Sequence, residues 1–317
     1  MRMDRLETMI PIPGGTFLMG SDHFYPEEAP VRRVSVGPFL MDATAVTNRA
    51  FAGFVTATGY VTLAERPAPA ELYPDVPAEA LAPASAVFHP PPAALDRGNA
   101  YQWWHYVPGA DWHHPEGPES HLDGREDHPV VHVAYEDALA YAIWAGKSLP
   151  TEAEWEFAAR GGLDGADYVW GDEFSPGGVH QANTWQGHFP WENLLEDGFA
   201  RTSPVGSFPA NGYGLYDMAG NVWEWTEDWF GPHRPAAKSC CTIDNPRGGA
   251  MESSVDPDML ELAIPRKVLK GGSYLCAPNY CQRYRPAARL AQAIDTTTGH
   301  VGFRCVVRPA AAMTLER

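Results

Sequence analysis

Residues 144–156 read Trp-Ala-Gly-Lys-Ser-Leu-Pro-Thr-Glu-Ala-Glu-Trp-Glu, and this stretch decides how the middle of the chain folds. Thr151 and Glu154 match a capping box, in which the threonine hydroxyl accepts a hydrogen bond from the glutamate backbone and the glutamate side chain reaches back to the threonine backbone. Trp155 and two alanines then share one face, and Gly161 supplies a C-terminal stop. The sequence therefore predicts a helix that begins after Thr151 and ends at Gly161.

Two more helices and a few short strands are predicted before this stretch. Apolar residues at helical spacing predict a helix over 135–146, and Thr47 and Gly59 can begin and end another whose apolar face carries two phenylalanines. Residues 9–20 are expected to form a pair of short strands around a Pro-Gly-Gly turn, and the alternation over 31–39 predicts a further strand.

Residues 66–98 form the clearest irregular segment of the sequence. Eight prolines lie between Pro67 and Pro92, a density that excludes long helices and central strands. We expect a surface excursion here, with a loop that contacts substrate as the alternative. No linker separates two cores, so the sequence predicts one α+β domain over residues 1–317, with about three helices and much irregular backbone.

The composition is that of a loop-rich globular protein, and it excludes several classes of function. Gly and Pro make up about 19% of the chain, against roughly 12% in average proteins. The 11 Trp, 13 Tyr and 13 Phe that accompany them would be missing from a disordered chain. A formal net charge of −17 argues against nucleic acid as a partner and against docking on an anionic membrane.

Cysteine usage and hydropathy indicate a cytoplasmic protein. No stretch approaches the length of a membrane span, and no signal peptide is visible. Five cysteines are an odd number and too few for a disulfide framework in 317 residues. We therefore expect a reducing cytoplasm; a secreted mature form whose leader has been removed is the alternative.

Cys276 and Cys281 form the first candidate site, in an aromatic segment led by Gly-Gly and followed by three arginines. Cationic neighbours lower the pKa of a thiol and raise its reactivity. At this spacing the pair can close a disulfide across a turn or present two thiolates to one soft metal, Cu(I) or Zn(II). A structural zinc site needs four ligands, whereas two-coordinate Cu(I) needs no more than these two. By spacing alone a structural role and redox or metal chemistry both remain open.

Two further segments could bind a hard cation such as Ca²⁺, which prefers carboxylate, amide and main-chain oxygens. Residues 211–229 combine glycine turns with three tryptophans, and main-chain oxygens lie between Asp217 and Glu224; the alternative is a tryptophan core with surface acids. In residues 183–199, an asparagine and a carboxylate bracket a loop, and ordinary turn residues are the alternative.

Other catalytic motifs are missing from the sequence. There is no HExxH or HxH pair, no phosphate-binding loop of the form Gly-x-x-x-x-Gly-Lys-Ser/Thr and no GxSxG. His113, His114 and His128 lie among Pro, Gly and Asp and are expected on loops. The vicinal pair Cys240-Cys241 lies in a polar stretch and is expected to be a stray pair rather than a site.

Taken together, these segments resemble the formylglycine-generating enzymes, also called sulfatase-modifying factors. Several motifs of the wider superfamily carry the resemblance, at residues 12–20, 42–48, 128–133, 144–156, 220–225 and 302–304. The feature specific to the formylglycine generators is the pair Cys276 and Cys281 inside Gly-Gly-Ser-Tyr-x-Cys-x-x-x-Tyr-Cys.

The resemblance implies both a fold and a reaction. The fold would be a single compact C-type-lectin-like domain, poor in regular secondary structure. The enzyme would act as a monomer and use O₂ to oxidise a cysteine in a Cys-x-Pro-x-Arg segment of an unfolded sulfatase to Cα-formylglycine. Cys276 and Cys281 would bind Cu(I), which agrees with the preference of a soft d¹⁰ ion for two thiolates.

The resemblance also implies roles for other residues. Ser273 and Tyr280 match polar residues that position substrate sulfur or oxygen, and Trp223 matches a tryptophan that walls the same pocket. Two structural calcium sites would carry over, to the following positions: Asn183, Thr184, Asp197 and Phe199 for one, and Asp217, Gly220, Val222 and Glu224 for the other. Asp217 replaces the usual asparagine of the family.

The sequence departs from the family in three further places. Ala277 replaces the histidine that commonly follows the first cysteine. Over residues 290–297, which line the substrate groove in the family, Asp295 alone is unchanged. Ala142 and Pro286 occupy positions of disulfide partners in eukaryotic members, so Cys305 is expected to be a free, buried thiol. The copper centre is thus expected to be intact and the peptide-binding wall altered.

Three other functions remain as alternatives. The same copper centre could act on a different cysteine peptide or on a small thiol. The domain could be a non-catalytic C-type-lectin-like binding module whose two cysteines form an inert disulfide. An ergothioneine-type iron sulfoxide synthase shares this domain, but it carries an additional helical domain with metal-binding histidines, for which this chain has neither room nor motif.

Overall fold

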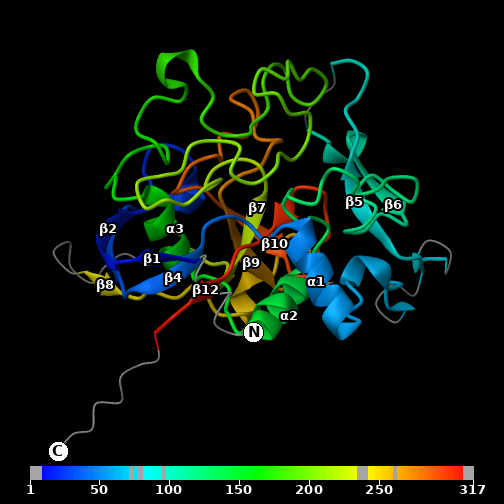
Figure 1. Cartoon of the computed structure of the whole chain (residues 1–317), viewed down its shortest axis with the longest axis horizontal. Helices are drawn as coiled ribbons and strands as arrows, with labels where there is room; N and C mark the ends of the chain where they lie inside the picture. The colour runs from blue at the N-terminus through cyan, green and yellow to red at the C-terminus, as the bar shows by residue number, and fades with distance from the viewer. Residues whose placement is uncertain are drawn as a thin grey trace, which may run out of the picture.

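A computed structural model describes residues 9–70, 75–77, 81–94, 98–233, 242–259 and 263–309 (Figure 1). Within these ranges the helices are α1 (Asn48–Thr58), α2 (Tyr135–Ala145) and α3 (Glu152–Arg160). The strands are β1 (Met9–Ile12), β2 (Gly15–Met19), β3 (Arg32–Val36), β4 (Phe39–Asp42), β5 (Ala84–Phe88), β6 (Trp104–Pro108), β7 (Trp223–Trp229), β8 (Ile243–Asp244), β9 (Arg266–Lys270), β10 (Arg289–Ala293), β11 (Val301–Gly302) and β12 (Val306–Val307). Short strands and long loops confirm the predicted α+β fold, poor in regular secondary structure.

The strands form four small sheets, ordered β1-β4-β12, β10-β9-β7-β11, β2-β3-β8 and β5-β6. The sheet β10-β9-β7-β11 lies in the middle of the molecule in Figure 1. Within it β7 runs antiparallel to β9 and parallel to β11. This sheet positions the candidate site, because β7 begins at Trp223 and β9 leads into the loop that carries the two conspicuous cysteines.

The two N-terminal strands form as predicted, but they do not pair with each other. Instead β1 pairs with β4 and β2 pairs with β3, so the chain changes sheets between them. Gly14 makes this crossing possible: its φ is +69°, and a Cβ there would lie 2.6 Å from the backbone of Gly37. The Pro-Gly-Gly segment is therefore a kink between two sheets that passes close to the backbone at Gly37, rather than a hairpin turn.

The three predicted helices are confirmed, with their caps. Thr47 accepts a hydrogen bond from the backbone of Ala50 at the start of α1, and Gly59 ends that helix in the left-handed conformation. At α3 both bonds of the capping box are present, from Glu154 N to Thr151 Oγ1 (3.1 Å) and from Thr151 N to Glu154 Oε2 (2.8 Å). Local capping chemistry was sufficient to place these helices because each signal acts within a few residues.

Replacing Thr151 by alanine should lower the free energy of unfolding by about 1 kcal/mol, the usual cost of losing an N-cap oxygen. Thr151→Ser keeps the oxygen and serves as the matched control. Urea denaturation of both variants checks this, and equal stability of the two would show that the hydroxyl is not used.

The expectation of a surface excursion is wrong for part of residues 66–98. Residues 84–88 form β5, which pairs with β6 and is largely buried; Ser85 and Phe88 are 0% and 3% exposed. Prolines flank this strand but do not interrupt it. Because β5 belongs to a two-stranded sheet, it is not a central strand, and the prediction that prolines exclude central strands here still holds. Residues 71–74, 78–80 and 95–97 lie outside the described part of the chain.

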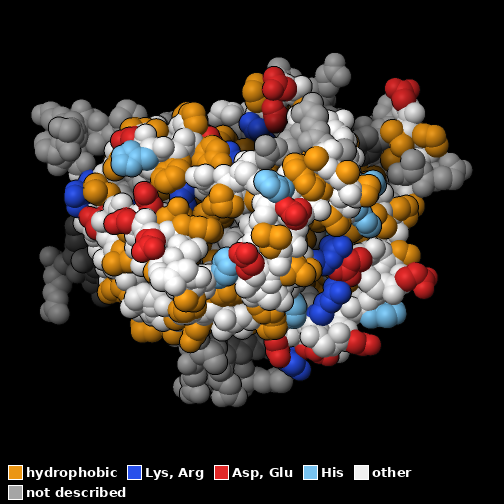
Figure 2. Space-filling view, turned by 90° about the horizontal axis from the view of Figure 1, so that it is seen from above, with side chains coloured by type: hydrophobic (Ala, Val, Ile, Leu, Met, Phe, Trp, Pro, Cys, Tyr) orange, Lys and Arg blue, Asp and Glu red, His pale blue; other side chains and the backbone are white. Residues whose placement is uncertain are grey.

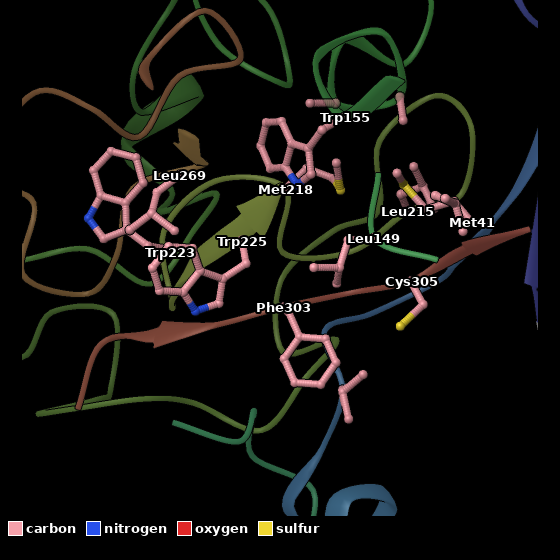
Figure 3. Packing of buried hydrophobic residues seen from close by; sticks show 14 of the residues in the cluster. Met41, Leu149, Trp155, Leu215, Met218, Trp223, Trp225, Leu269, Phe303 and Cys305 are labelled. Atoms are coloured by element: carbon pink, nitrogen blue, oxygen red, sulfur yellow. The ribbon is translucent and has the colours of Figure 1, made fainter. Parts of the chain in front are cut away.

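The main hydrophobic core surrounds β7 and α3. Figure 3 shows Trp155 of α3 beside Met218, and Trp223 and Trp225 of β7 beside Leu269 of β9. Trp155 and Trp225 are fully buried, and their indole N–H groups donate to Glu224 (2.7 Å) and to the carbonyl of Val133 (3.0 Å). Aromatic rings with satisfied polar ends thus replace the long helices that this core lacks.

The loops gather above the sheets in Figure 1, and Figure 2 shows that face from above, with hydrophobic side chains and histidines spread across it. Among the described residues, no helix has the length and apolar character needed to cross a membrane.

Candidate active site

A single tight turn brings Cys276 and Cys281 together. The carbonyl oxygen of Ala277 accepts hydrogen bonds from the backbone N–H groups of Tyr280 (3.0 Å) and Cys281 (2.8 Å). Pro278 fits inside this turn because it has no N–H group to satisfy. The two Sγ atoms lie 3.2 Å apart, and both thiols are free. The turn thus brings the sulfur atoms of two cysteines that are close in the sequence into contact.

The two glycines that precede the turn close the loop at its base. Gly271 and Gly272 follow β9 with φ values of +95° and +72°. A Cβ on Gly272 would lie 2.7 Å from the carbonyl oxygen of Arg283, which leaves the turn on the other side. The Gly-Gly pair therefore lets the two arms of the loop pass at a distance that a side chain would prevent.

Arg283 supplies positive charge to the sulfur pair. Its Nη1 lies 3.9 Å from Cys281 Sγ, its Nη2 pairs with Glu27 Oε1 at 2.7 Å, and its guanidinium lies 3.9 Å from the ring centre of Tyr25. The hydrogen bond from Cys276, together with Arg283, lowers the pKa of Cys281 to about 7. Burial and the neighbouring sulfur raise the pKa of Cys276 well above its usual value. The pair therefore holds one thiolate near neutral pH.

The cysteines open into a cavity of about 240 Å³ with aromatic walls. Trp223 comes from the start of β7, Trp104 from β6 and Phe189 from a loop. Tyr280 stacks on Phe189 with ring centres 4.2 Å apart and is 42% exposed, so it stands at the rim. Cys276 is 2% exposed and lies deeper. Three far-apart segments thus enclose a sulfur centre and exclude water from most of its surface.

Ser273 and His300 form the polar part of this cavity. Ser273 Oγ is buried and lies 3.2 Å from His300 Nδ1, and the imidazole contacts the ring of Trp104. Burial lowers the pKa of His300 to about 3, so the ring is neutral at physiological pH. His300 was missed by sequence reasoning; its position next to the Val-Gly-Phe-Arg motif was the one available signal.

The structure thus places Ser273, Tyr280 and Trp223 around the same cavity as the two cysteines. Of the positions where the sequence departs from the family that it resembles, Leu290 also lines the cavity, and Ala277, within the turn, is fully buried. Asp295, the unchanged member of the altered segment, follows β10 on the exposed side. The altered segment therefore contributes an apolar side chain, that of Leu290, to the wall of the cavity.

The first predicted calcium set comes together in the structure. Asp197 accepts hydrogen bonds from the backbone N–H groups of Thr184 (3.0 Å) and Phe199 (3.0 Å). Asn183 is 1% exposed; its amide nitrogen donates to the carbonyl of Arg201, while its Oδ1 has no hydrogen-bond partner among the described residues. A buried oxygen without a donor is costly, and a cation would satisfy it. These residues fit a hard cation.

The two acids of the second set, Asp217 and Glu224, lie near each other, but their charges are arranged differently from those of the first set. Glu224 is bound by Arg304 at 2.7 Å and by the indole of Trp155. Asp217 accepts one bond, from Gly206 N, and burial raises its pKa to about 6. Gly220 and Val222 lie between the two acids in the chain. This set fits a cation in part, because Arg304 already neutralises one of its two carboxylates.

Within the described ranges, no group of three or more His, Cys, Asp or Glu side chains is placed to hold a metal. A metal bound here would rest on the two thiols or on mixed carboxylate, amide and main-chain oxygens. Cys305 is free and 0% exposed, as predicted. Cys240 and Cys241 lie outside the described residues.

Fold and cavity define an α+β domain of the C-type-lectin-like type with a paired-thiol site. Residues 2–309 match the family of sulfatase-modifying factor enzyme 1-like domains. The chain is 53% identical over 307 residues to a formylglycine-generating enzyme of Mycobacterium tuberculosis, covering 96% of this chain and 99% of that one. The chain therefore belongs to the formylglycine-generating enzyme family, as the sequence motifs predicted.

Two other relatives bear on this assignment. A bovine protein named inactive C-alpha-formylglycine-generating enzyme 2 is 38% identical over 94% of this chain and 87% of its own. The structure of PvdO from Pseudomonas aeruginosa superimposes with a TM-score of 0.58 at 23% identity, over 95% of this chain and 94% of that one. PvdO supports the fold alone, and the bovine relative shows that similarity over most of the chain does not by itself decide activity.

Proposed function

We propose that this chain is a formylglycine-generating enzyme, which converts a cysteine of a sulfatase polypeptide to Cα-formylglycine. The observation that carries the proposal is the free thiol pair at the base of an aromatic cavity, with sulfur atoms 3.2 Å apart. The full-length similarity to relatives of that name supports it.

The net chemistry is an oxidation followed by a hydrolysis. Two electrons and two protons leave the CH₂–SH group of the substrate to give a thioaldehyde, and O₂ is proposed to take up both electrons and both protons. Water then replaces the sulfur, which leaves as hydrogen sulfide, and an aldehyde remains. Acid–base side chains alone cannot carry such an oxidation, so a redox-active centre is needed.

Cu(I) is the cofactor that the donor set fits. Two sulfur ligands satisfy a soft d¹⁰ ion, whereas structural zinc needs four ligands. Cys276 and Cys281 would hold the copper ion. When bound, it would react with O₂, which is the chemistry that the side chains lack. The pKa of about 7 for Cys281 means that one ligand is available as thiolate near neutral pH.

The other residues bind and orient the substrate. Trp223, Phe189 and Trp104 would exclude water from the reacting carbon. Ser273, whose hydroxyl is held by the neutral His300, would orient the substrate sulfur or oxygen, and Tyr280 at the rim would contact the polypeptide. We propose a Cys-x-Pro-x-Arg segment as substrate and a reducing compartment as the place of action.

Mass spectrometry of a synthetic peptide tests the proposed reaction. The purified protein, loaded with one equivalent of Cu(I), is mixed under air with a peptide containing Leu-Cys-Thr-Pro-Ser-Arg. We expect loss of the thiol and gain of an aldehyde; peptides with Ala in place of Pro or Arg serve as matched controls. Equal conversion of all peptides would contradict the proposed recognition, and no conversion of any would contradict the reaction.

We also propose that the first set, around Asn183 and Asp197, binds a structural Ca²⁺. Calcium should raise the thermal midpoint of the wild type, because a ligand that binds only the folded state stabilises it. Asp197→Asn should lose this calcium-dependent rise, while Glu196→Gln, which removes the same charge from the exposed neighbour, should keep it. Differential scanning calorimetry with calcium and with chelator checks this; an equal rise in both variants would contradict the site.

A further inference from the structure

The three arginines that follow the cysteine pair have different surroundings. Arg285 pairs with the buried Glu28, with Nη1 2.9 Å from Oε2. Arg289 pairs with the buried Glu152 at 2.7 Å. Arg283 is the one of the three that lines the cavity of the cysteine pair. Among the described residues that line this cavity, it is also the only Lys, Arg, Asp or Glu. Negative charge that forms in the cavity therefore faces this guanidinium.

A segment from the N-terminal part of the chain fixes the guanidinium of Arg283. Its central carbon lies 3.9 Å from the ring centre of Tyr25, and its Nη2 donates to Glu27 Oε1 at 2.7 Å. The hydroxyl of Tyr25 also accepts a hydrogen bond, at 3.0 Å, from the backbone N–H of Gln282. Nη1 faces Cys281 Sγ at 3.9 Å. Because these contacts hold the cation in place, it needs little reorganisation when negative charge develops on sulfur.

The proposed function, on which this inference rests, brings more negative charge here than the cysteine pair has by itself. Two thiolates around one Cu(I) carry one net negative charge, and a substrate cysteine bound beside them as a thiolate would add a second. Cys276 is 2% exposed, so water compensates little of this charge. The side chain of Glu27 is 26% exposed, so water screens the carboxylate that already pairs with Arg283. The guanidinium can therefore still stabilise the buried sulfur atoms.

We propose that Arg283 allows the substrate cysteine to bind as its thiolate, by offsetting the negative charge that this thiolate adds to the sulfur centre. A guanidinium suits this role, because its separate N–H groups can hold Glu27 and face sulfur at the same time. Tyr25 and Glu27 act through Arg283 as positioning residues. Arg283 should therefore contribute to the binding of a cysteine peptide and not to that of a serine peptide, whose hydroxyl stays neutral.

Peptide binding without O₂ tests this role apart from turnover. Fluorescence anisotropy of a labelled peptide containing Leu-Cys-Thr-Pro-Ser-Arg gives its Kd for the Cu(I)-loaded protein, and a second peptide has Ser in place of Cys. Arg283→Gln should weaken binding of the cysteine peptide by about tenfold, a typical loss for a hydrogen bond to a charged group. Binding of the serine peptide should not change. Equal weakening of both peptides, or no weakening of either, would overturn the proposal.

Two further variants separate the charge of Arg283 from its place in the fold. Arg283→Lys keeps the charge and should recover part of the lost affinity for the cysteine peptide; a lysine variant no better than the glutamine variant would contradict a role of charge. Arg49→Gln removes the same charge from an exposed arginine that pairs with Asp127, and it should bind both peptides like the wild type. If the wild type itself bound no Cu(I), the proposed function would fail, and this inference with it.

Discussion

Replacing either Cys276 or Cys281 by serine is expected to reduce turnover of the peptide by about 10³-fold or more, as removal of a group at the reacting centre does. A serine hydroxyl is a hard, weakly acidic group, and it cannot replace a thiolate toward a soft metal. The double variant should be no worse than either single one, because residues that act as a unit give non-additive losses. Initial rates of aldehyde formation measure this.

Cys305→Ala is the matched control for these cysteine variants. Cys305 is also a buried free thiol, but it lies in the core shown in Figure 3 and does not line the cavity. This variant should retain turnover and bind one equivalent of Cu(I), while both serine variants lose Cu(I) binding. Full turnover in Cys276→Ser would contradict the proposed centre, whatever the stability of the variant.

The largest effect on stability is expected from Glu156→Gln, which should lower the free energy of unfolding at pH 7 by about 3–5 kcal/mol. Glu156 is fully buried and accepts hydrogen bonds from Lys270 Nζ (3.0 Å), Arg160 Nη2 (2.8 Å) and Gly20 N (2.8 Å). Glutamine would leave two buried cations without their charge partner. Because α3, β9 and the strand before Gly20 meet at this carboxylate, the loss should affect the whole domain.

The pH dependence of this effect has a defined sign. Although burial opposes ionisation, Lys270 and Arg160 lower the pKa of Glu156 to about 2. A carboxyl group with a lowered pKa stabilises the fold above its unfolded pKa of 4.5, and this stabilisation is lost as the pH falls through 2. Glutamine cannot titrate, so the gap between the two proteins should narrow from pH 5 downward. Urea unfolding at pH 7 and pH 3 measures this, with the exposed Glu119→Gln as control; a constant gap would contradict it.

The sequence was sufficient to predict the structure wherever the signal depends on residues close together in the chain. The capping box at Thr151, the glycine stops and the turn that joins Cys276 to Cys281 each depend on residues a few positions apart, and the structure has all of them. The same locality explains why the sulfur pair could be proposed as a site before any fold was known.

Predictions failed or were missing where the partner is far away in the chain. The turn residues at Gly14 could not show that β1 would pair with β4, because backbone contacts with Gly37 decide it. His300 meets Ser273 only after β11 has been placed beside β7.

One measurement tests the central claim most directly: the rate of aldehyde formation as a function of added Cu(I). Metal-free protein at fixed concentration is titrated with Cu(I) under air in the presence of excess peptide. The account predicts no conversion without copper, a linear rise to one equivalent per chain and a plateau beyond it. Conversion that is equally fast in metal-free protein, or a plateau at a different stoichiometry, would contradict a two-thiolate copper centre.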